Sequence, residues 1–174
     1  LGTSTDAIDL AEDRDRFRSM MQKLGIPQPD SGMAHNLQEA LAIAERIGYP
    51  LMVRPSYVLG GRGMEVVHDE EDLTLYVARA VEIWPNLPIL IDKFLENALE
   101  VEADAISDGA DAFIPAIMEH IELAGIHSGD SACVLPPVSI PDKHKKTIEE
   151  YTKRIAIELK VLGLINIQYA IAGD

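Results

Sequence analysis

The stretch LMVRPSYVLGGRGMEVV, residues 51–67, is the part of this sequence that decides the fold. It begins with an apolar segment that runs into the basic residue Arg54, and it continues into a turn that contains Gly60, Gly61, Arg62 and Gly63. Glycines let the backbone take positive φ values and approach a ligand closely. Two guanidiniums, Arg54 before the turn and Arg62 within it, match phosphate or carboxylate oxygens in a bidentate fork. The stretch therefore predicts two strands joined by a flap that closes over an anionic ligand.

This turn differs from a Walker A motif in the segment that comes after it. A Walker A motif needs Gly-Lys and then Ser or Thr at the opening of a helix. Here the next residues are Met64-Glu65-Val66-Val67, which we interpret as a strand. The sequence therefore favours a glycine-arginine hairpin over a phosphate-binding loop at a helix N-terminus.

Composition limits the class of protein. The chain has 174 residues, enough for one domain or at most one and a half, and 47% of them are hydrophobic. Its low aromatic content, 5%, with many aliphatic residues, favours an α/β protein over a β-sandwich. No apolar run approaches the length of a membrane span and no signal peptide is visible, so the expected compartment is the cytosol. The single cysteine, Cys133, is expected to be a small core residue rather than a nucleophile.

The charge balance constrains the partners. Fifteen basic and twenty-nine acidic residues give a net charge of −14, which repels nucleic acid and anionic membrane surfaces. We therefore expect neither as a partner. A phosphorylated ligand would need a local cluster of cations, helped by a divalent metal.

Periodicity predicts an α/β alternation. A helix begins near Asp6 and helical spacing resumes after the charged patch 12–16, until Gly25 ends it. Asn36 and Glu39 resemble a capping box, Asp69 caps a helix that runs to about Trp84, and residues 107–110 form the turn of a hairpin. A further helix starts near Asp142 and carries Leu162 on its apolar face, with Gly163 as its breaker. The remaining expected segments are strands at 51–54, 64–68, 89–94, 99–106, 111–119 and 164–172 and an apolar piece at 131–138.

These elements divide into three parts. Residues 1–27 are an N-terminal helical segment, and the Pro27/Pro29 stretch is a linker. Residues 28–95 run β-α-β-loop-β-α-β and form a small α/β lobe that carries the flap. Residues 96–174 form a second lobe, an antiparallel sheet with one long helix. A nucleotide between two such lobes is the expected arrangement, because pockets prefer lobe boundaries.

Two polar stretches are candidate sites. The loop 125–130, Gly-Ile-His-Ser-Gly-Asp, holds His, Ser and Asp too close together for a catalytic triad, so we interpret it as a loop that holds ribose or phosphate. The stretch 119–122, Glu-His-Ile-Glu, lacks zinc-ligand spacing, and we favour a polar strand end over a metal site.

Three single residues also stand out. Glu100 follows a strand end, where it is either a ribose acceptor or a solvated strand residue. Gln168 lies in an apolar strand, so its amide must face a polar partner or a site. Arg14 sits among Asp13, Asp15 and Arg16, where helical ion pairs compete with a ligand role.

Four blocks in order resemble the carbamoyl-phosphate synthetase large subunit, specifically an ATP-grasp segment, and the resemblance covers essentially the whole chain. The blocks are LGTSTDAIDLAEDRDRF, GYPLMVRPSYVLGGRGMEVV, IMEHIELAGIHSGDSACVLPP and LGLINIQYA. The resemblance implies an ATP-grasp fold of two lobes. Two segments are more similar to the C-terminal, carbamate-phosphorylating half of the family, GGRGMEVV and SGDSACVLPP. In place of the first segment, the bicarbonate-phosphorylating half typically has GGSGGG.

The resemblance implies roles for individual residues. Arg14 and Arg54 would contact the nucleotide phosphates, and the turn from Gly60 to Gly63, with Arg62, would be the lid over them. Gln168 would be the first ligand of the catalytic Mg²⁺ or Mn²⁺. The residues implied around the adenosine and the nucleotide site are Lys93 and Leu95 near adenine, Glu100 on the ribose, and Gly125, Ile126, His127 and Ser128. Lys93 replaces a histidine that is frequent in the family.

The implied function is transfer of the γ-phosphoryl of MgATP to carbamate, which gives carbamoyl phosphate for pyrimidine and arginine synthesis. The implied partners are ATP, carbamate, the rest of the large subunit and a glutaminase small subunit. Further metal ligands in an E-x-N-P-R block would lie beyond Asp174, so we expect the chain to be a segment truncated at its C-terminal end, with negligible turnover alone. Three alternatives stay open: the bicarbonate-phosphorylating half, another ATP-grasp carboxylase such as a biotin carboxylase, and a non-catalytic nucleotide-binding module.

Overall fold

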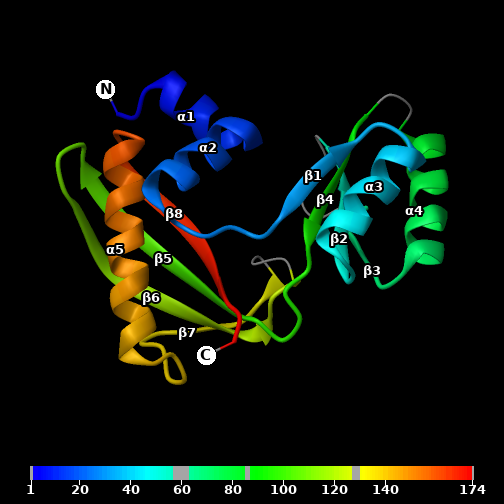
Figure 1. Ribbon diagram of the computed structural model, residues 1–174. Coiled ribbons are helices and arrows are strands. Elements are labelled where there is room, and N and C mark those ends of the chain that lie inside the picture. The colour runs from blue at the N-terminus through cyan, green and yellow to red at the C-terminus, as the bar shows by residue number, and fades with distance from the viewer. Residues whose placement is uncertain (1, 57–62, 85–86, 127–129, 174) are drawn as a thin grey trace. The chain divides into compact units, whose positions relative to one another are not determined.

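The chain forms two compact units, described here from a computed structural model (Figure 1). The structure describes residues 2–56, 63–84, 87–126 and 130–173. The smaller unit is Pro29–Glu96, and the larger unit combines Leu1–Gln28 with Asn97–Asp174. The N-terminal helices therefore pack with the C-terminal half of the chain.

The smaller unit is a four-stranded antiparallel sheet with two helices on one face, and its strand order is β1-β4-β2-β3. Its elements are β1 (Ser31–Ala34), α3 (Leu37–Ile47), β2 (Leu51–Pro55), β3 (Glu65–Val67), α4 (Glu70–Ile83) and β4 (Ile89–Lys93). This order confirms the predicted alternation. Leu51, Val53 and Ile91 point from the strands into a core shared with α3 and α4, where each has 0% exposure. One face of the sheet is thus covered by helices.

The two predicted helix caps are present in this unit. Asn36 Oδ1 accepts a hydrogen bond from the Glu39 backbone N–H at 2.9 Å, and Glu39 reaches back to the His35 backbone N–H at 2.7 Å. Asp69 Oδ1 accepts from the Asp72 backbone N–H at 2.9 Å. Each cap satisfies a donor that the first helical turn leaves without an intrahelical partner.

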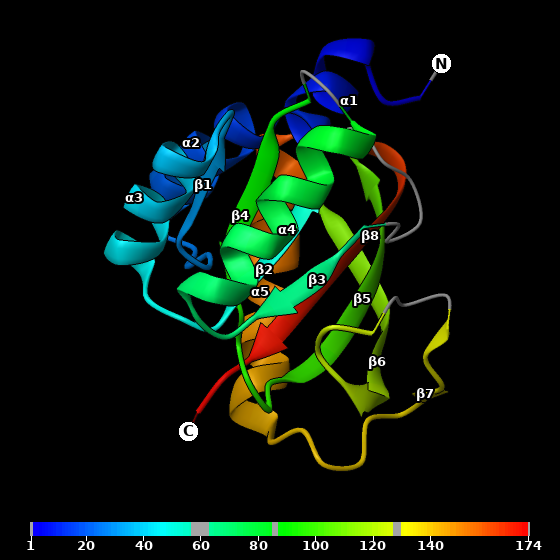
Figure 2. The same cartoon turned by 90° about the vertical axis from the view of Figure 1, so that its right-hand side faces the viewer.

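The larger unit holds a second antiparallel sheet, of strand order β7-β6-β5-β8. Its elements are α1 (Thr5–Glu12), α2 (Arg14–Leu24), β5 (Leu99–Asp108), β6 (Ala112–Leu123), β7 (Cys133–Val134), α5 (Asp142–Glu158) and β8 (Leu162–Ile171). Figures 1 and 2 show α5 lying along one face of this sheet. Val101 and Ala103 pack with Ile148 of α5, while Ile165 and Ile167 of β8 pack in a cluster with α2 and α5.

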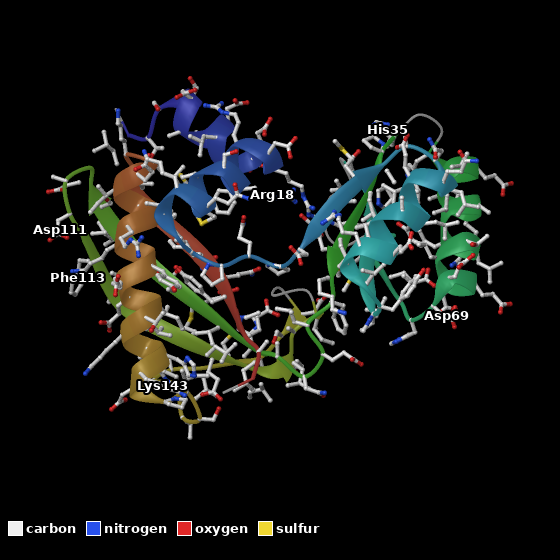
Figure 3. All side chains as sticks on the ribbon, in the orientation of Figure 1. Arg18, His35, Asp69, Asp111, Phe113 and Lys143 are labelled. Atoms are coloured by element: carbon white, nitrogen blue, oxygen red, sulfur yellow. The ribbon has the colours of Figure 1, made fainter. Side chains whose placement is uncertain are left out.

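The β5–β6 hairpin confirms the turn predicted at 107–110. Asp108 Oδ1 accepts hydrogen bonds from the backbone N–H groups of Ala110 and Asp111, both at 2.8 Å, and Gly109 takes a φ of 90°. The N–H groups of Asp111 and Ala110 lower the pKa of Asp108 because they favour its charged form. Figure 3 places Asp111 and Phe113 beside this end of the hairpin, and Phe113 is 68% exposed.

Three details differ from the sequence-based expectation. The helix predicted to carry Leu162 ends at Glu158, and Leu162 instead opens β8, because Lys160 turns the chain with a φ of 52°. The charged patch 12–16 contains a helix break, since Asp13 is both the C-cap of α1 and the N-cap of α2. Cys133 is exposed on β7, so the prediction of a core cysteine was wrong.

Among the described residues, the helices are all too short or too polar to cross a membrane.

Candidate nucleotide site

On the smaller unit, Arg54 lies on the sheet face that α3 and α4 leave open. It pairs in register with Leu90, which pairs in turn with Met33, and directly opposed residues of antiparallel strands share a face. The next row on this face contains Met52 opposite Asp92. This face therefore combines the apolar side chains of Met33, Met52 and Leu90 with the guanidinium of Arg54 and the carboxylate of Asp92. The apolar part of a ligand could lie on the former and an anionic part beside the guanidinium.

Lys93 ends β4, and its side chain binds back to the protein. The ammonium donates hydrogen bonds to the backbone carbonyls of Gly48, at 3.1 Å, and Tyr49, at 2.7 Å. Gly48 is the C-cap of α3, so the cation meets the negative end of that helix. Leu95, two residues further on, is half-buried. The two hydrogen bonds of Lys93 therefore hold the loop before β2.

On the larger unit, alternation along β5 places three acidic side chains on the sheet face away from α5. They are Glu100, Glu102 and Asp104, and the residues between them are buried. Gln168 of β8 is in register with Glu102 and donates from Nε2 to Glu102 Oε1 at 2.8 Å. Asn166 is in register with Asp104 and donates from Nδ2 to Asp104 Oδ1 at 2.9 Å. Together these five side chains form the polar face of the larger sheet.

The polar partner expected for Gln168 is therefore present, although Gln168 itself is exposed. Glu100 is in register with Ala170 and lies diagonally across from Gln168, so the sheet brings these two predicted site residues together. The Glu100 side chain is 13% exposed.

His120 of β6 is a further member of this face, which sequence reasoning missed as a site residue. Its side chain is 1% exposed, with Nδ1 4.0 Å from Glu100 Oε1 and Nε2 3.3 Å from Glu102 Oε1. Within the described part of the chain, neither ring nitrogen has a hydrogen bond of good geometry. The structure reveals its place through the register of β6 against β5, because Met118, two residues before His120, is in register with Glu102. Without that register, His120 stands out only as part of the polar stretch 119–122.

The two glutamates of that stretch hold a loop. Glu119 accepts from the backbone N–H groups of Val138, at 2.7 Å, and Ser139, at 2.8 Å, and from the Ser139 hydroxyl. Burial alone would raise the pKa of Glu119, but the hydrogen bonds from Ser139 and Val138 lower it. Glu122 accepts from Ser131 Oγ at 2.7 Å and from the Ala132 backbone N–H at 2.8 Å, which lowers its pKa.

Gly125 and Ile126 follow the end of β6. The Ala124 backbone N–H donates to the Ala98 carbonyl at 3.0 Å, which places the start of this loop beside the start of β5, near Glu100. Gly125 takes a φ of 111°, a value that favours glycine, and Ile126 is 47% exposed. His127 and Ser128, which complete this predicted set, lie outside the described residues.

The predicted flap is described only at its edge. Gly60, Gly61 and Arg62 lie outside the described residues. Gly63 has a φ of 70°, and its carbonyl accepts a hydrogen bond from Tyr76 Oη at 2.7 Å. Helix α4 thus anchors the point where the predicted flap rejoins the sheet.

Arg14 is the first residue of α2 and is half-buried. Its neighbour Arg16 forms ion pairs with Asp6, at 2.9 Å, and with Asp9, both on α1. The hydrogen bond that Arg16 donates to the Asp6 carboxylate is the main reason that the pKa of Arg16 is raised. A ligand role for Arg14 stays a prediction.

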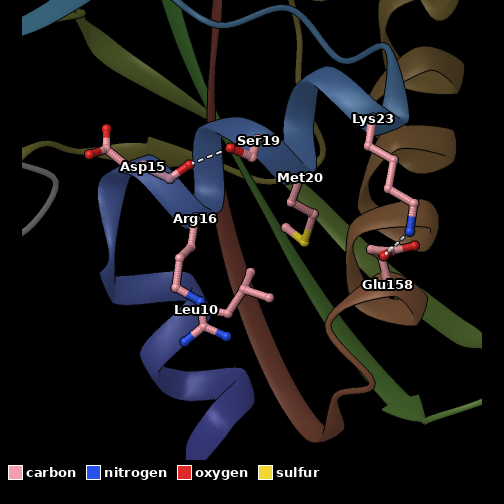
Figure 4. A pocket seen from close by; sticks show the side chains of 7 residues that line it. All are labelled: Leu10, Asp15, Arg16, Ser19, Met20, Lys23 and Glu158. Atoms are coloured by element: carbon pink, nitrogen blue, oxygen red, sulfur yellow. Dashed lines mark hydrogen bonds and ion pairs between the residues drawn. The ribbon is translucent and has the colours of Figure 1, made fainter.

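A separate hollow lies where α1, α2 and the end of α5 meet (Figure 4). It is lined by Leu10, Asp15, Arg16, Ser19, Met20, Lys23 and Glu158. The ion pair of Lys23 with Glu158, 2.6 Å long, crosses one side of it. Of the predicted nucleotide-site residues that the structure describes, none lines this hollow.

The polar face of the larger sheet can supply one oxygen ligand to a magnesium ion. Because Gln168 gives its NH₂ group to Glu102, its carbonyl oxygen is turned away from that carboxylate. Mg²⁺ prefers oxygen ligands and is commonly held by one or two protein groups together with nucleotide phosphates. Among the described residues there is no cluster of three or more His, Cys, Asp or Glu side chains that would hold a metal without such help.

Comparison with known proteins agrees with this picture. Residues 13–174 match the family described as carbamoyl-phosphate synthase L chain, ATP binding domain. The carbamoyl phosphate synthase large chain of Archaeoglobus fulgidus is 61% identical over 171 residues, which is 98% of this chain and 16% of that protein. The corresponding large chain of Methanothermobacter thermautotrophicus is 59% identical over 174 residues, 100% of this chain and 16% of that protein. The chain thus spans about a sixth of the length of these relatives.

Solved structures show the same fold at low identity. Biotin carboxylase from Campylobacter jejuni, in a β-γ-ATP complex, has a TM-score of 0.81 at 21% identity, over 98% of this chain and 40% of that one. D-alanyl-alanine synthetase A from Vibrio cholerae has a TM-score of 0.78 at 18% identity, over 99% and 55%. The α/β, ATP-grasp fold predicted from the sequence is confirmed. By the match of residues 13–174 and the identity to its relatives, the chain belongs to the family of carbamoyl-phosphate synthase large-chain ATP-binding domains.

Proposed function

We propose that this chain binds MgATP and phosphorylates carbamate within the large chain of a carbamoyl phosphate synthase. The family match supports the reaction class. The segments GGRGMEVV and SGDSACVLPP support carbamate over bicarbonate, because they resemble the C-terminal half of the family. The structural observation that carries the proposal is the polar face of the larger sheet, where Gln168 and Glu100 lie close together with the amide oxygen of Gln168 directed away from Glu102.

In this proposal the two units are the two ATP-grasp lobes. The smaller lobe contributes Arg54 to the phosphates and the main chain around Lys93 and Leu95 to the adenine. The larger lobe contributes Glu100 to the ribose hydroxyls and Gln168 to the metal ion, Mg²⁺ or Mn²⁺. The remaining assigned residues are Arg14, Gly60, Gly61 and Arg62 at the phosphates, and Gly125, Ile126, His127 and Ser128 along the nucleotide.

The protein's part in the reaction is positioning and charge compensation. A carbamate oxygen forms a bond to the γ-phosphorus, the bond from that phosphorus to the β–γ bridging oxygen breaks, and ADP leaves. Protein groups do little covalent chemistry in such a transfer. Arg54, Arg62 and Arg14 would offset the negative charge of the phosphate oxygens, and a bound magnesium ion would supply further charge compensation there. Closure of the flap would exclude water, which matters because carbamate hydrolyses readily.

The wider assignments follow from the same proposal. The product would enter pyrimidine and arginine synthesis, and the working enzyme would combine the rest of the large chain with a glutaminase small subunit in the cytoplasm. The chain alone, at about a sixth of the length of its relatives, would have negligible turnover.

The experiment uses the complete protein that carries this chain and measures two partial reactions in the variant Arg54→Ala. Carbamoyl phosphate and ADP should give ATP in the wild type, by reversal of the proposed step, and the variant should lose this activity by at least a hundredfold. Its bicarbonate-dependent ATP hydrolysis should stay within threefold of wild type. The opposite pattern would assign the chain to the bicarbonate-phosphorylating half, and an unchanged variant would refute the phosphate role of Arg54.

A further inference from the structure

Glu102 occupies the centre of the polar face of the larger sheet. Its Oε1 accepts the Gln168 amide at 2.8 Å, and its Oε2 lies 3.4 Å from Asn166 Nδ2. This acidic side chain is only 13% exposed. A carboxylate held this deeply by cross-strand partners is an ordered group rather than a solvated surface acid.

The chemistry of a carboxylate fixes the orientation of the Gln168 amide. An ionised carboxylate can only accept hydrogen bonds, so it can bind only the NH₂ end of a neighbouring amide. The carbonyl oxygen of Gln168 must then point away from Glu102. A neutral amide or hydroxyl in place of Glu102 could bind either end, and an apolar residue could bind neither.

The sheet itself enforces this contact. Glu102 and Gln168 are directly opposed in the β5–β8 ladder, so their side chains meet on one face without help from a mobile loop. From the other side, His120 packs against Glu102, with Nε2 3.3 Å from Oε1, and its ring is 1% exposed. Glu102 thus lies between a buried side chain, His120, and an exposed one, Gln168.

We propose that Glu102 is a positioning residue that holds the Gln168 amide with its carbonyl oxygen directed at the magnesium ion. The inference rests on the proposed function, because it takes Gln168 as the metal ligand. Glu102 acts through Gln168, and loss of such a supporting group typically weakens metal affinity or activity by about 10- to 100-fold.

The test compares Glu102→Leu and Glu102→Gln in the complete protein that carries this chain. Mn²⁺ is the probe, and its binding in the presence of saturating ADP is followed by electron paramagnetic resonance. We expect Glu102→Leu to weaken the Mn²⁺ affinity at the site by about 10- to 100-fold. Glu102→Gln, which keeps the shape and fixes the amide less firmly, should weaken it by at least threefold. ADP affinity measured without metal should stay within twofold of wild type in both variants.

The matched control is Asp104→Asn. Asp104 lies on the same strand and face but binds Asn166, so this variant should leave Mn²⁺ affinity within twofold of wild type. The same loss in Asp104→Asn as in the Glu102 variants would overturn the inference, since it would indicate general damage to the face.

The partial reaction from carbamoyl phosphate and ADP gives a second readout. In Glu102→Gln the concentration of free Mg²⁺ that gives half-maximal rate should rise at least threefold, while saturating Mg²⁺ restores most of the rate. Mn²⁺ affinity within twofold of wild type in both Glu102 variants would overturn the positioning role. A wild-type protein that binds ADP without any nucleotide-dependent Mn²⁺ site would instead overturn the proposed function.

Discussion

Lys93 is the predicted nucleotide-site residue whose structural contacts give the sharpest stability prediction. Substitution Lys93→Met keeps the length of the side chain and removes its charge. It deletes two hydrogen bonds, to the Gly48 and Tyr49 carbonyls, at the C-terminal end of α3. Each hydrogen bond to a charged group contributes about 1.5–3 kcal/mol, and releasing an ordered lysine returns up to about 2 kcal/mol of side-chain entropy. Because the two bonds share one ammonium and the carbonyls regain some water, we expect a net loss of about 2 kcal/mol.

The assay is urea unfolding followed by Trp84 fluorescence, a signal that reports on the smaller unit. Trp84 is the only tryptophan in the sequence, and it packs against the core of this unit. With a urea dependence of about 1 kcal/mol per M, the midpoint of the Trp84 fluorescence transition should fall by roughly 2 M.

The control is Lys23→Met. Lys23 makes a 2.6 Å ion pair with Glu158, but its side chain is 67% exposed, and exposed pairs contribute at most about 1 kcal/mol. This substitution also lies in the larger unit, so it should leave the Trp84 transition unchanged. A Lys93→Met midpoint equal to that of wild type would refute the bracing role of the ammonium. Loss of ADP binding without loss of stability would show instead that the ammonium serves the ligand.

Three further predictions concern the predicted flap, the larger core and pH. Gly63→Ala should destabilise the smaller unit by about 2 kcal/mol and shift the Trp84 emission, because φ is 70° and an added Cβ would lie 2.8 Å from the Trp84 ring; an unchanged midpoint would contradict this. Thr152→Val should lower the free energy of unfolding, measured by circular dichroism, by about 1–3 kcal/mol, because it leaves the half-buried Tyr169 hydroxyl without its 2.8 Å partner. The double variant Thr152→Val/Tyr169→Phe should lose less free energy of unfolding than the sum of the two single variants. Glu119 has a folded-state pKa below its ordinary value of 4.5, so the stability that it contributes is present above pH 4.5 and is lost as pH falls through the folded pKa. The urea midpoints at pH 6 and pH 4 should therefore differ less in Glu119→Gln than in wild type. Equal differences in the two proteins would refute the argument.

Local patterns predicted much of the fold. The caps at Asn36 and Asp69 and the hairpin at 107–110 depend on short-range hydrogen bonds, which residue type and spacing reveal. The end of α5 was harder to place, because Leu162 continues the apolar spacing of the helix while its backbone joins the β5–β8 ladder. Pairing with a distant strand outweighed local periodicity there.

The candidate site was predictable in its residue types and not in its pairings. Alternation places Glu100, Glu102 and Asp104 on one face, but only the register of β8 against β5 shows that Gln168 meets Glu102. The burial of His120 between Glu100 and Glu102 depends on the third strand, β6. Such contacts follow from strand register, which a single sequence determines weakly.

The most direct test of the proposed ATP site is hydrogen exchange of the complete protein with and without a non-hydrolysable ATP analogue and Mg²⁺. We predict slower exchange at residues 93–95 and 98–101, at the loop that begins with Gly125, and at 166–170, with the last of these protected only when Mg²⁺ is present. Protection restricted to other parts of the chain, or none that depends on the nucleotide, would contradict the claim that these residues form its ATP site.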